Sequence, residues 1–223
     1  EIPPASRLTL GEAYAYACPA PFMQLYDAIG TERFQELYNL FRLDSPPVMS
    51  GFPLMPADAT NNTFTYEDAL GQGETTVTVA QMAAIAAAIV NGGNAPQPNL
   101  LHAVRSPDST EWQVVREVRE SIPITTDEVS RRVQTLMRES TVFGSARRAA
   151  RSEIAIGGHA SLARAGEVTL SWFMGFALTG TQDGIAIALV LEDTDDPTLA
   201  AEIGGQVLEI AYQRSIGLDT AND

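Results

Sequence analysis

Three apolar stretches in the last third of the chain constrain its fold more than any other feature. They are separated by glycine-containing turns and cover residues 153–162, 169–178 and 184–192. Runs of this length that are bounded by turn residues are typical of β-strands. Because consecutive strands with short connections pair antiparallel, the three stretches predict an antiparallel sheet.

Helical patterns precede and follow these strands. The clearest covers 79–90, an alanine-rich run that Thr78 is suited to cap and that Asn91-Gly92-Gly93 would end. Further elements are predicted as helices after Thr9, Thr31 and Thr126 and over 197–215, and as a pair of short strands near 100–105 and 111–118. Residues 44–75 are predicted to form a long loop, of the kind that often serves as a lid. Helices on the faces of an antiparallel sheet give an α+β class, and we expect one domain over 1–223.

The charge balance excludes one class of partner. The chain has 28 acidic and 14 basic residues and a formal net charge of −14. Such a field repels phosphate backbones and anionic lipid surfaces, so nucleic acid is not an expected partner. One cysteine and two histidines give neither an intramolecular disulfide nor a standard zinc site, so we expect no metal and no cofactor. The apolar run 79–90 is too short to span a bilayer, and any membrane anchor is expected outside this chain.

One segment resembles a known family. Residues 71–93 read GQGETTVTVAQMAAIAAAIVNGG, which is similar to the part of high-molecular-weight penicillin-binding proteins that reads GQG, then VTPLQMA, then a helix ending in ANGG. The resemblance continues in the same order: 10–43 are similar to the family's Ser-x-Asn helix and the stretch after it, 172–177 to its WFVGFAP strand, 185–192 to the next strand and 200–212 to the closing helix. The chain therefore resembles the C-terminal part of a penicillin-binding protein transpeptidase domain. This implies a β-lactamase-like fold without that domain's N-terminal strands.

The resemblance also implies a chemistry. Transpeptidases of this family use Ser-x-x-Lys, Ser-x-Asn and Lys-Thr-Gly to activate a serine and to hold the substrate. The positions of the last two motifs are Ala17, Cys18 and Pro19 and, within one residue, Gly158, His159 and Ala160. All fourteen basic residues are arginines, so no register supplies a lysine. Ser-x-x-Lys would precede Glu1 in the family's order, and the motifs are interpreted as degenerate.

Three side chains near these positions are candidates for a remaining role. Cys18 and His159 would face each other across the family's cleft, which allows a Cys-His nucleophile pair. A cysteine in the middle of that triplet is better interpreted as a small apolar residue that points away from the cleft. His159 and Ser161 are candidates for a remnant cleft in which His159 donates hydrogen bonds to a carboxylate. A strand-surface histidine without a role is the alternative.

Two further groups are given structural interpretations. The aromatic residues of the second predicted strand, 169–178, are predicted to belong to the core rather than to a ligand platform; they are Trp172, Phe173 and Phe176. The basic cluster after Gly144 is interpreted as a solvated loop; it consists of Arg147, Arg148 and Arg151.

The functional expectation follows from the matched scaffold and the missing lysines. We expect a catalytically inactive transpeptidase-like module with a structural or protein-interaction role on the extracytoplasmic side of a bacterial envelope, membrane-anchored in the full-length protein. The alternatives are a divergent D,D-transpeptidase whose nucleophile lies upstream, and a non-catalytic module that binds cell-wall peptide. Because the family's N-terminal strands lie beside the last strand, Gly184–Glu192 is predicted to be an unpaired edge that another envelope protein or a second copy covers.

Overall fold

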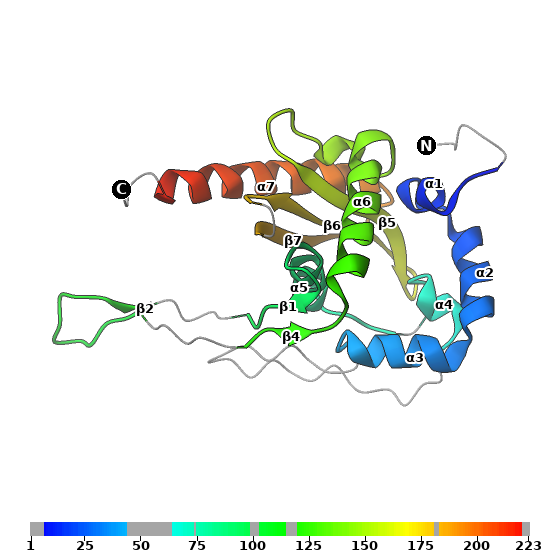
Figure 1. Ribbon diagram of the computed structural model, residues 1–223, viewed down its shortest axis with the longest axis horizontal. Helices are drawn as coiled ribbons and strands as arrows, with labels where there is room; N and C mark the ends of the chain where they lie inside the picture. Colours follow the sequence, from blue (N-terminus) through cyan, green and yellow to red (C-terminus); the bar gives the residue numbers. More distant parts are fainter. Residues whose placement is uncertain are drawn as a thin grey trace.

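The sheet has the predicted antiparallel topology. The computed structural model describes residues 7–43, 64–73, 75–98, 103–114, 120–180 and 183–219. Within them, β5 (Ile156–Ala165), β6 (Val168–Leu178) and β7 (Gly184–Glu192) form a three-stranded sheet in the order β5-β6-β7 (Figure 1). The register places His159 opposite Met174 and Ser161 opposite Trp172.

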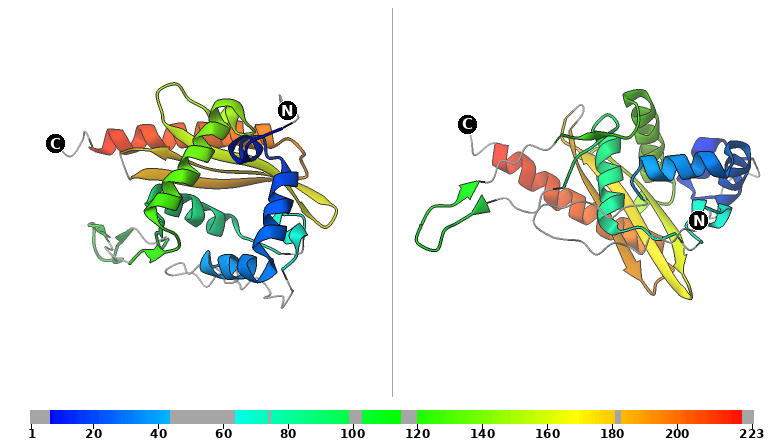
Figure 2. Two further views of the ribbon diagram at one scale, coloured as in Figure 1. Left: turned by 45° about the vertical axis from the view of Figure 1, so that its right-hand side comes forward. Right: turned by 90° about the horizontal axis from the view of Figure 1, so that it is seen from below.

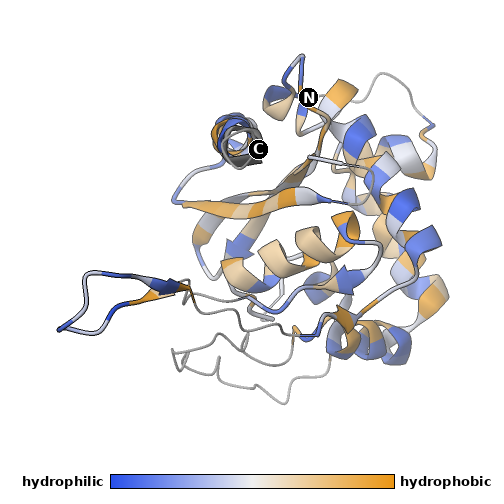
Figure 3. Ribbon diagram, turned by 60° about the vertical axis from the view of Figure 1, so that its left-hand side comes forward, coloured by the Kyte–Doolittle hydropathy of each residue, from blue (hydrophilic) through white to orange (hydrophobic). Residues whose placement is uncertain are grey.

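Helices cover both faces of this sheet, as an α+β fold requires. Helix α7 (Pro197–Asp219) packs on one face, and α5 (Val79–Val90) and α6 (Asp127–Phe143) pack on the other (Figure 3). The α7 face is centred on Phe173, which is fully buried. The opposite face is centred on Phe176, packed with α5 and α6. Successive residues of β6 point to opposite faces, which is why one strand supplies both cores.

The N-terminal helices stand at the end of the molecule opposite the C-terminal end of α7 (Figures 1 and 2). They are α1 (Leu10–Ala15), α2 (Pro19–Ile29), α3 (Thr31–Leu40) and the short α4 (Tyr66–Ala69). Helix α1 packs on α6 and so brings this group beside the sheet. The predicted loop 44–75 is wrong at α4, where Thr65 forms a capping box with Asp68. Residues 44–63 of that loop lie outside the described residues.

Threonine caps account for most of the helix starts. Thr9, Thr78 and Thr126 accept hydrogen bonds from the first turns of α1, α5 and α6, which confirms three of the predicted caps. The prediction for Thr31 is wrong, because Gly30 is the N-cap of α3. The Thr31 hydroxyl is instead 2.8 Å from the hydroxyl of Tyr26 and joins α3 to α2.

Short strands complete the described part of the chain. They are β1 (Asn94–Ala95) paired with β4 (Ile122–Pro123), and β2 (Ala103–Val104) paired with β3 (Gln113–Val114). The second pair confirms the predicted hairpin, which projects away from the rest of the molecule (Figure 2). A 3₁₀ turn, η1 (Arg147–Ala149), links α6 to the sheet.

Candidate functional site

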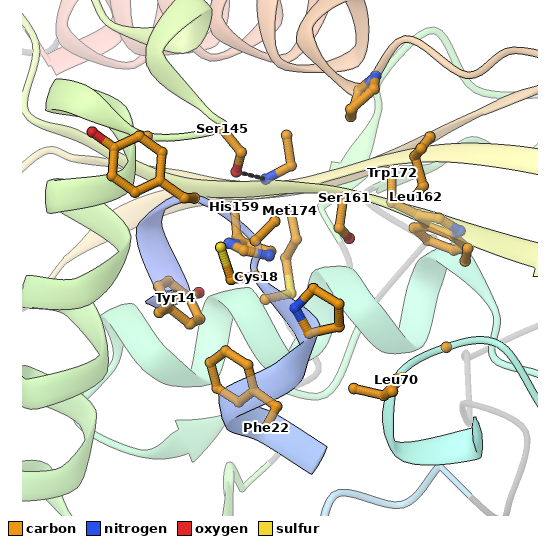
Figure 4. A pocket seen from close by; sticks show the side chains of 18 of the residues that line it. Tyr14, Cys18, Phe22, Leu70, Ser145, His159, Ser161, Leu162, Trp172 and Met174 are labelled. Carbon is orange, nitrogen blue, oxygen red and sulfur yellow. Dashed lines mark hydrogen bonds between the residues drawn. The ribbon is translucent and has the colours of Figure 1, made fainter. Parts of the chain in front are cut away.

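A cavity of about 950 Å³ lies between the α1–α2 junction and the face of β5 and β6 that carries His159 (Figure 4). Its walls come mainly from the junction, the two strands and the Gly71 turn that follows α4, with further residues from the α6–η1 segment and the starts of α5 and α7. Residues of the junction include Tyr14, Cys18 and Phe22; those of the strands include His159, Ser161, Trp172 and Met174; those of the turn include Leu70 and Gln72. The resemblance therefore pointed to residues that the fold brings together, since Ala17, Cys18, Pro19, His159, Ala160 and Ser161 all line this one cavity.

The α1–α2 junction is a tight left-handed turn. Helix α1 ends with Ala17 N–H donating to the Tyr14 carbonyl at 3.0 Å and Cys18 N–H donating to the Ala13 carbonyl at 2.9 Å. This double closure requires a left-handed residue, and Ala17 adopts it with φ of 54°. A residue with a Cβ pays about 1 kcal/mol for that conformation. Pro19, whose fixed φ suits a first helical position, then starts α2.

Ser145 holds this junction against the sheet. Its backbone N–H donates to the Ala15 carbonyl at 2.7 Å, and its Oγ accepts from the Ala160 N–H of β5 at 3.3 Å (Figure 4). The approach depends on Gly144, because a Cβ there would lie 2.1 Å from the Ala15 carbonyl oxygen. Sequence reasoning missed Ser145, and the only signal was its position directly after a glycine that ends a helix.

His159 is a half-buried side chain whose ring is neutral. Its ring centroid lies 4.5 Å from that of Tyr14, and burial lowers the pKa of His159 to about 4. Burial also raises the pKa of Tyr14, so both rings are uncharged at neutral pH. Nδ1 of His159 is buried and has no hydrogen-bond partner among the described residues. An imidazole in this state cannot present a positive charge to a carboxylate.

Cys18 and His159 enter the same cavity but do not form a hydrogen-bonded pair at Nδ1 (Figure 4). The thiol is partly exposed and lines the cavity, whereas the sequence favoured a side chain that points away from it. A nucleophilic thiol needs a neighbour that takes its proton. With the pKa of His159 so low, the imidazole is a weak base for that step.

The far end of the cavity is closed by the turn after α4. Gln72 Nε2 donates to the Leu162 carbonyl at 3.3 Å, and Arg164 N–H donates to the Gly71 carbonyl at 3.2 Å. These bonds occupy the outer edge of β5 beyond Ser161. Trp172 lies at this end and is only partly buried, which corrects its prediction as a core residue. Phe173 and Phe176 are fully buried, as predicted.

The basic cluster after Gly144 is more ordered than a solvated loop. Arg148 pairs with Glu202 at 2.9 Å and Arg151 pairs with Glu209 at 2.8 Å, so η1 is joined to α7. Arg147 and Arg148 also line the cavity. The correction arises because α7 supplies carboxylates at i and i+7, a pairing that only the tertiary fold creates.

The described residues form neither a metal-ligand cluster nor a membrane-spanning helix. No group of three or more His, Cys, Asp and Glu side chains there is arranged to hold a metal ion. None of the helices described combines the length and apolarity that crossing a bilayer requires.

Sequence comparison decides the family. The profile of the penicillin binding protein transpeptidase domain matches residues 3–209. The chain belongs to this family. Among its relatives is the peptidoglycan D,D-transpeptidase PbpA of Mycolicibacterium smegmatis, 27% identical over 234 residues that cover 94% of this chain and 45% of PbpA. PbpA of Mycobacterium tuberculosis is 27% identical over 92% of this chain and 44% of its own length. This transpeptidase-family chain thus spans less than half the length of these relatives.

Solved structures of the family confirm the fold class. The imipenem acyl-enzyme complex of penicillin-binding protein A from M. tuberculosis superposes with a TM-score of 0.76 at 26% identity, over 93% of this chain and 48% of that one. The D,D-transpeptidase domain of a peptidoglycan glycosyltransferase from Eggerthella lenta has a TM-score of 0.77 at 24% identity, over 93% of this chain and 54% of that one.

Proposed function

We propose that this chain is a transpeptidase-like module that does not perform acyl transfer by itself. The observation that carries the proposal is the complete absence of lysine from a chain whose family uses lysine in two motifs. A serine hydroxyl is a poor nucleophile until a neighbouring base takes its proton. These 223 residues offer no lysine amine for that step.

The cavity supports the same proposal. If Ala17, Cys18 and Pro19 occupy the Ser-x-Asn position, the hydroxyl and the carboxamide of that motif are replaced by a methyl group and a proline ring. His159, at or next to the lysine of Lys-Thr-Gly, is neutral. Groups that act as a unit lose most of their catalytic effect together. We therefore propose that the cavity wall keeps the shape of the family's site without its chemistry.

The setting is proposed from the relatives. Both curated relatives are peptidoglycan D,D-transpeptidases, and we propose that this chain works in the bacterial cell envelope, on the extracytoplasmic side, in a structural or protein-binding role. Any membrane anchor would lie outside these residues.

Labelling with a fluorescent penicillin tests the proposal. The chain is incubated with the reagent, run on a denaturing gel and weighed as an intact protein, with M. tuberculosis penicillin-binding protein A as the positive control because it forms acyl-enzyme complexes. We expect no adduct. A stoichiometric adduct would sink the proposal, and repeating the experiment with Cys18→Ala would show whether the thiol or a hydroxyl carries it.

A second function is favoured by one observation. The relatives carry more than half of their length outside the matched region, which leaves room for a nucleophile in a longer protein. In that case the chain would be the C-terminal half of a divergent D,D-transpeptidase. Penicillin labelling of the full-length protein, if this chain alone stays unlabelled, separates the two.

The cavity also supports a binding role without cleavage. Trp172, Ser161 and the Gly71 turn offer an aromatic face and polar groups at one end. Calorimetric titration with a cell-wall stem peptide tests this role, and a Trp172→Ala variant that binds equally well would argue against the cavity as the binding site.

A further inference from the structure

The turn after α4 lies along the outer edge of β5, near the end of that strand (Figures 1 and 2). The Leu162 carbonyl accepts a hydrogen bond from Gln72 Nε2 at 3.3 Å. Two residues on, the Arg164 N–H donates to the Gly71 carbonyl at 3.2 Å. Leu162 and Arg164 therefore point their backbone groups outward, away from β6. We call residues 70–73, which meet these groups, the strap.

The strap uses only part of what this edge offers. Leu162 and Arg164 each present one N–H and one carbonyl. The strap bonds the carbonyl of Leu162 and the N–H of Arg164. The Leu162 N–H has no hydrogen-bond partner among the residues that the structure describes. A strand paired antiparallel at the same place would bond both groups of each residue. The strap thus covers the edge with fewer hydrogen bonds than an added strand would form.

The strap is built on α4 and not on the sheet. Its Gly71 N–H donates to the Asp68 carbonyl at 3.0 Å. Its Gln72 N–H donates to the Glu67 carbonyl at 2.8 Å. Asp68 Oδ1 also accepts from the Thr75 N–H at 2.8 Å, which closes the turn from its other side. These bonds are shorter than the two that reach β5, so the strap can leave the strand while its own structure stays intact.

We propose that the strap is an autoinhibitory contact: it holds the place of an added strand at the outer edge of β5, and an extended peptide pairs there when the strap moves away. A backbone N–H of the peptide would replace Gln72 at the Leu162 carbonyl, and a peptide carbonyl would accept from the Leu162 N–H. This proposal deepens the binding role given to the cavity above and rests on it.

The surroundings of the edge fit a peptide of this kind. Leu162 is 40% exposed, so an apolar side chain on the peptide gains a cross-strand contact with it. A second copy of the chain is a poorer occupant, because each copy carries a net charge of −14 and two copies repel at long range.

The first test removes the Gln72 bond. The probe is a fluorescent peptide of alternating threonine and valine with blocked ends, and its binding to the whole chain is followed by fluorescence anisotropy. Gln72→Ala should bind the probe about fivefold more tightly than wild type, because one hydrogen bond of ordinary net strength no longer has to break. Gln97→Ala removes a similar bond, to the Glu120 carbonyl at 3.1 Å, outside the cavity lining. It should leave the affinity unchanged.

The second test locks the strap to the strand. A Cβ on Gly71 would lie 3.6 Å from the Cβ of Ala163, within the separation of about 3.5–4.5 Å that a disulfide needs. Gly71→Cys and Ala163→Cys are combined in a Cys18→Ala chain. Once oxidised, this chain should bind the probe about tenfold more weakly than after reduction, because the cross-link removes the open state. Cys18→Ala alone, with and without reductant, is the control.

Two further measurements keep the tests decisive. Gly71 has φ of 69°, so a cysteine there is strained; if the cross-linking variant loses its thermal transition by circular dichroism, Gln72→Ala decides alone. Hydrogen exchange then locates the probe, which should slow exchange of the Leu162 amide. A probe with N-methylated valines cannot donate to the Leu162 carbonyl and should bind about fivefold more weakly.

The outcomes separate this proposal from the functions proposed above. Equal affinity of wild type and Gln72→Ala, or of the oxidised and reduced cross-linking variant, would mean that the strap does not compete with a peptide, and the binding role of the cavity would stand. No binding by any of these chains would overturn both the strap and that binding role. Penicillin labelling does not involve the strap, so the proposed lack of acyl transfer is decided separately.

Discussion

The two faces of the sheet differ in how completely they are filled. On the α7 face, three glycines let neighbouring backbone pack directly against the ring of Phe173. A Cβ on Gly204 would lie 2.1 Å from this ring, and a Cβ on Gly158 or Gly175 would lie 2.6 Å from it. The other face carries His159 and Trp172 above a cavity of about 950 Å³. Stability should therefore depend more on the packing around Phe173 than on the cavity, whose lining residues can vary in chemistry without loss of the fold.

The largest effect is expected at Phe173. Phe173→Ala should lower the free energy of unfolding by about 3–5 kcal/mol, because the tightly packed glycine surfaces around it cannot collapse into the space. Urea denaturation measures the change. Trp172→Ala, the next residue on the opposite face, serves as the control and should cost clearly less. Equal losses at the two positions would remove the contrast between the faces.

The second largest effect is the loss of stability at low pH that His159, on the cavity face, is expected to cause. The pKa of His159 is about 4 in the folded chain, whereas the ordinary pKa of a histidine is 6.5. The unfolded chain therefore binds the proton first as pH falls, so stability decreases from pH 6.5 down to about 4, by roughly 3 kcal/mol in total.

The control for that prediction is His159→Gln, which cannot titrate. Its stability should fall less steeply over the same pH window in a series of urea titrations. Glu12 and Asp196 also have lowered pKa values, through hydrogen bonds from Thr9 and Thr198 respectively, but they are present in both proteins and cancel in the difference. Parallel pH profiles would mean that His159 is accessible to solvent.

A smaller effect is expected where the two regions meet. Gly144→Ala should destabilise the chain by about 2 kcal/mol, because its Cβ would overlap the Ala15 carbonyl and push α1 away from β5. Chemical denaturation checks the value. Gly180→Ala, whose Cβ would meet nothing closer than 3.7 Å, should be nearly neutral. A neutral Gly144→Ala would show that the junction moves freely against the sheet.

The smallest effect is a gain. Ala17→Gly should stabilise the chain by up to about 1 kcal/mol, because it removes the strain of a left-handed alanine. Thermal denaturation measures it, and Ala20→Gly inside α2 should instead lower the melting temperature. If Ala17→Gly destabilises, the turn does not hold the observed φ in solution.

The sequence was most informative where local patterns agree with the tertiary fold. The antiparallel strands, the α5 helix and the caps at Thr9, Thr78 and Thr126 follow from spacing and side-chain chemistry that act within a few residues. The prediction of Thr31 as a cap failed because Gly30, with φ of 84°, already supplies the non-helical residue before α3. The pattern of Tyr66–Ala69 is too short to be distinguished from a loop.

The candidate site was predicted only in part, because its chemistry depends on contacts between distant segments. The resemblance brought Cys18 and His159 to the same cavity, but nothing local indicates that Tyr14 would bury the imidazole or that Ser145 would join α1 to β5. Trp172 was misjudged for the same reason: alternation along β6 shows that neighbours face opposite sides, not which side is filled.

Ser145 has a mechanical consequence. Ser145 bonds both the last carbonyl of α1 and the edge amide of Ala160 in β5, so the two walls of the cavity are tied together at this point. A ligand that enters at this end must fit the width that the two Ser145 hydrogen bonds set, and the cavity can widen there only if both of these bonds break. A larger ligand can be accommodated more easily at the opposite end, where, among the described residues, the side-chain amide of Gln72 and one backbone hydrogen bond join the turn to β5.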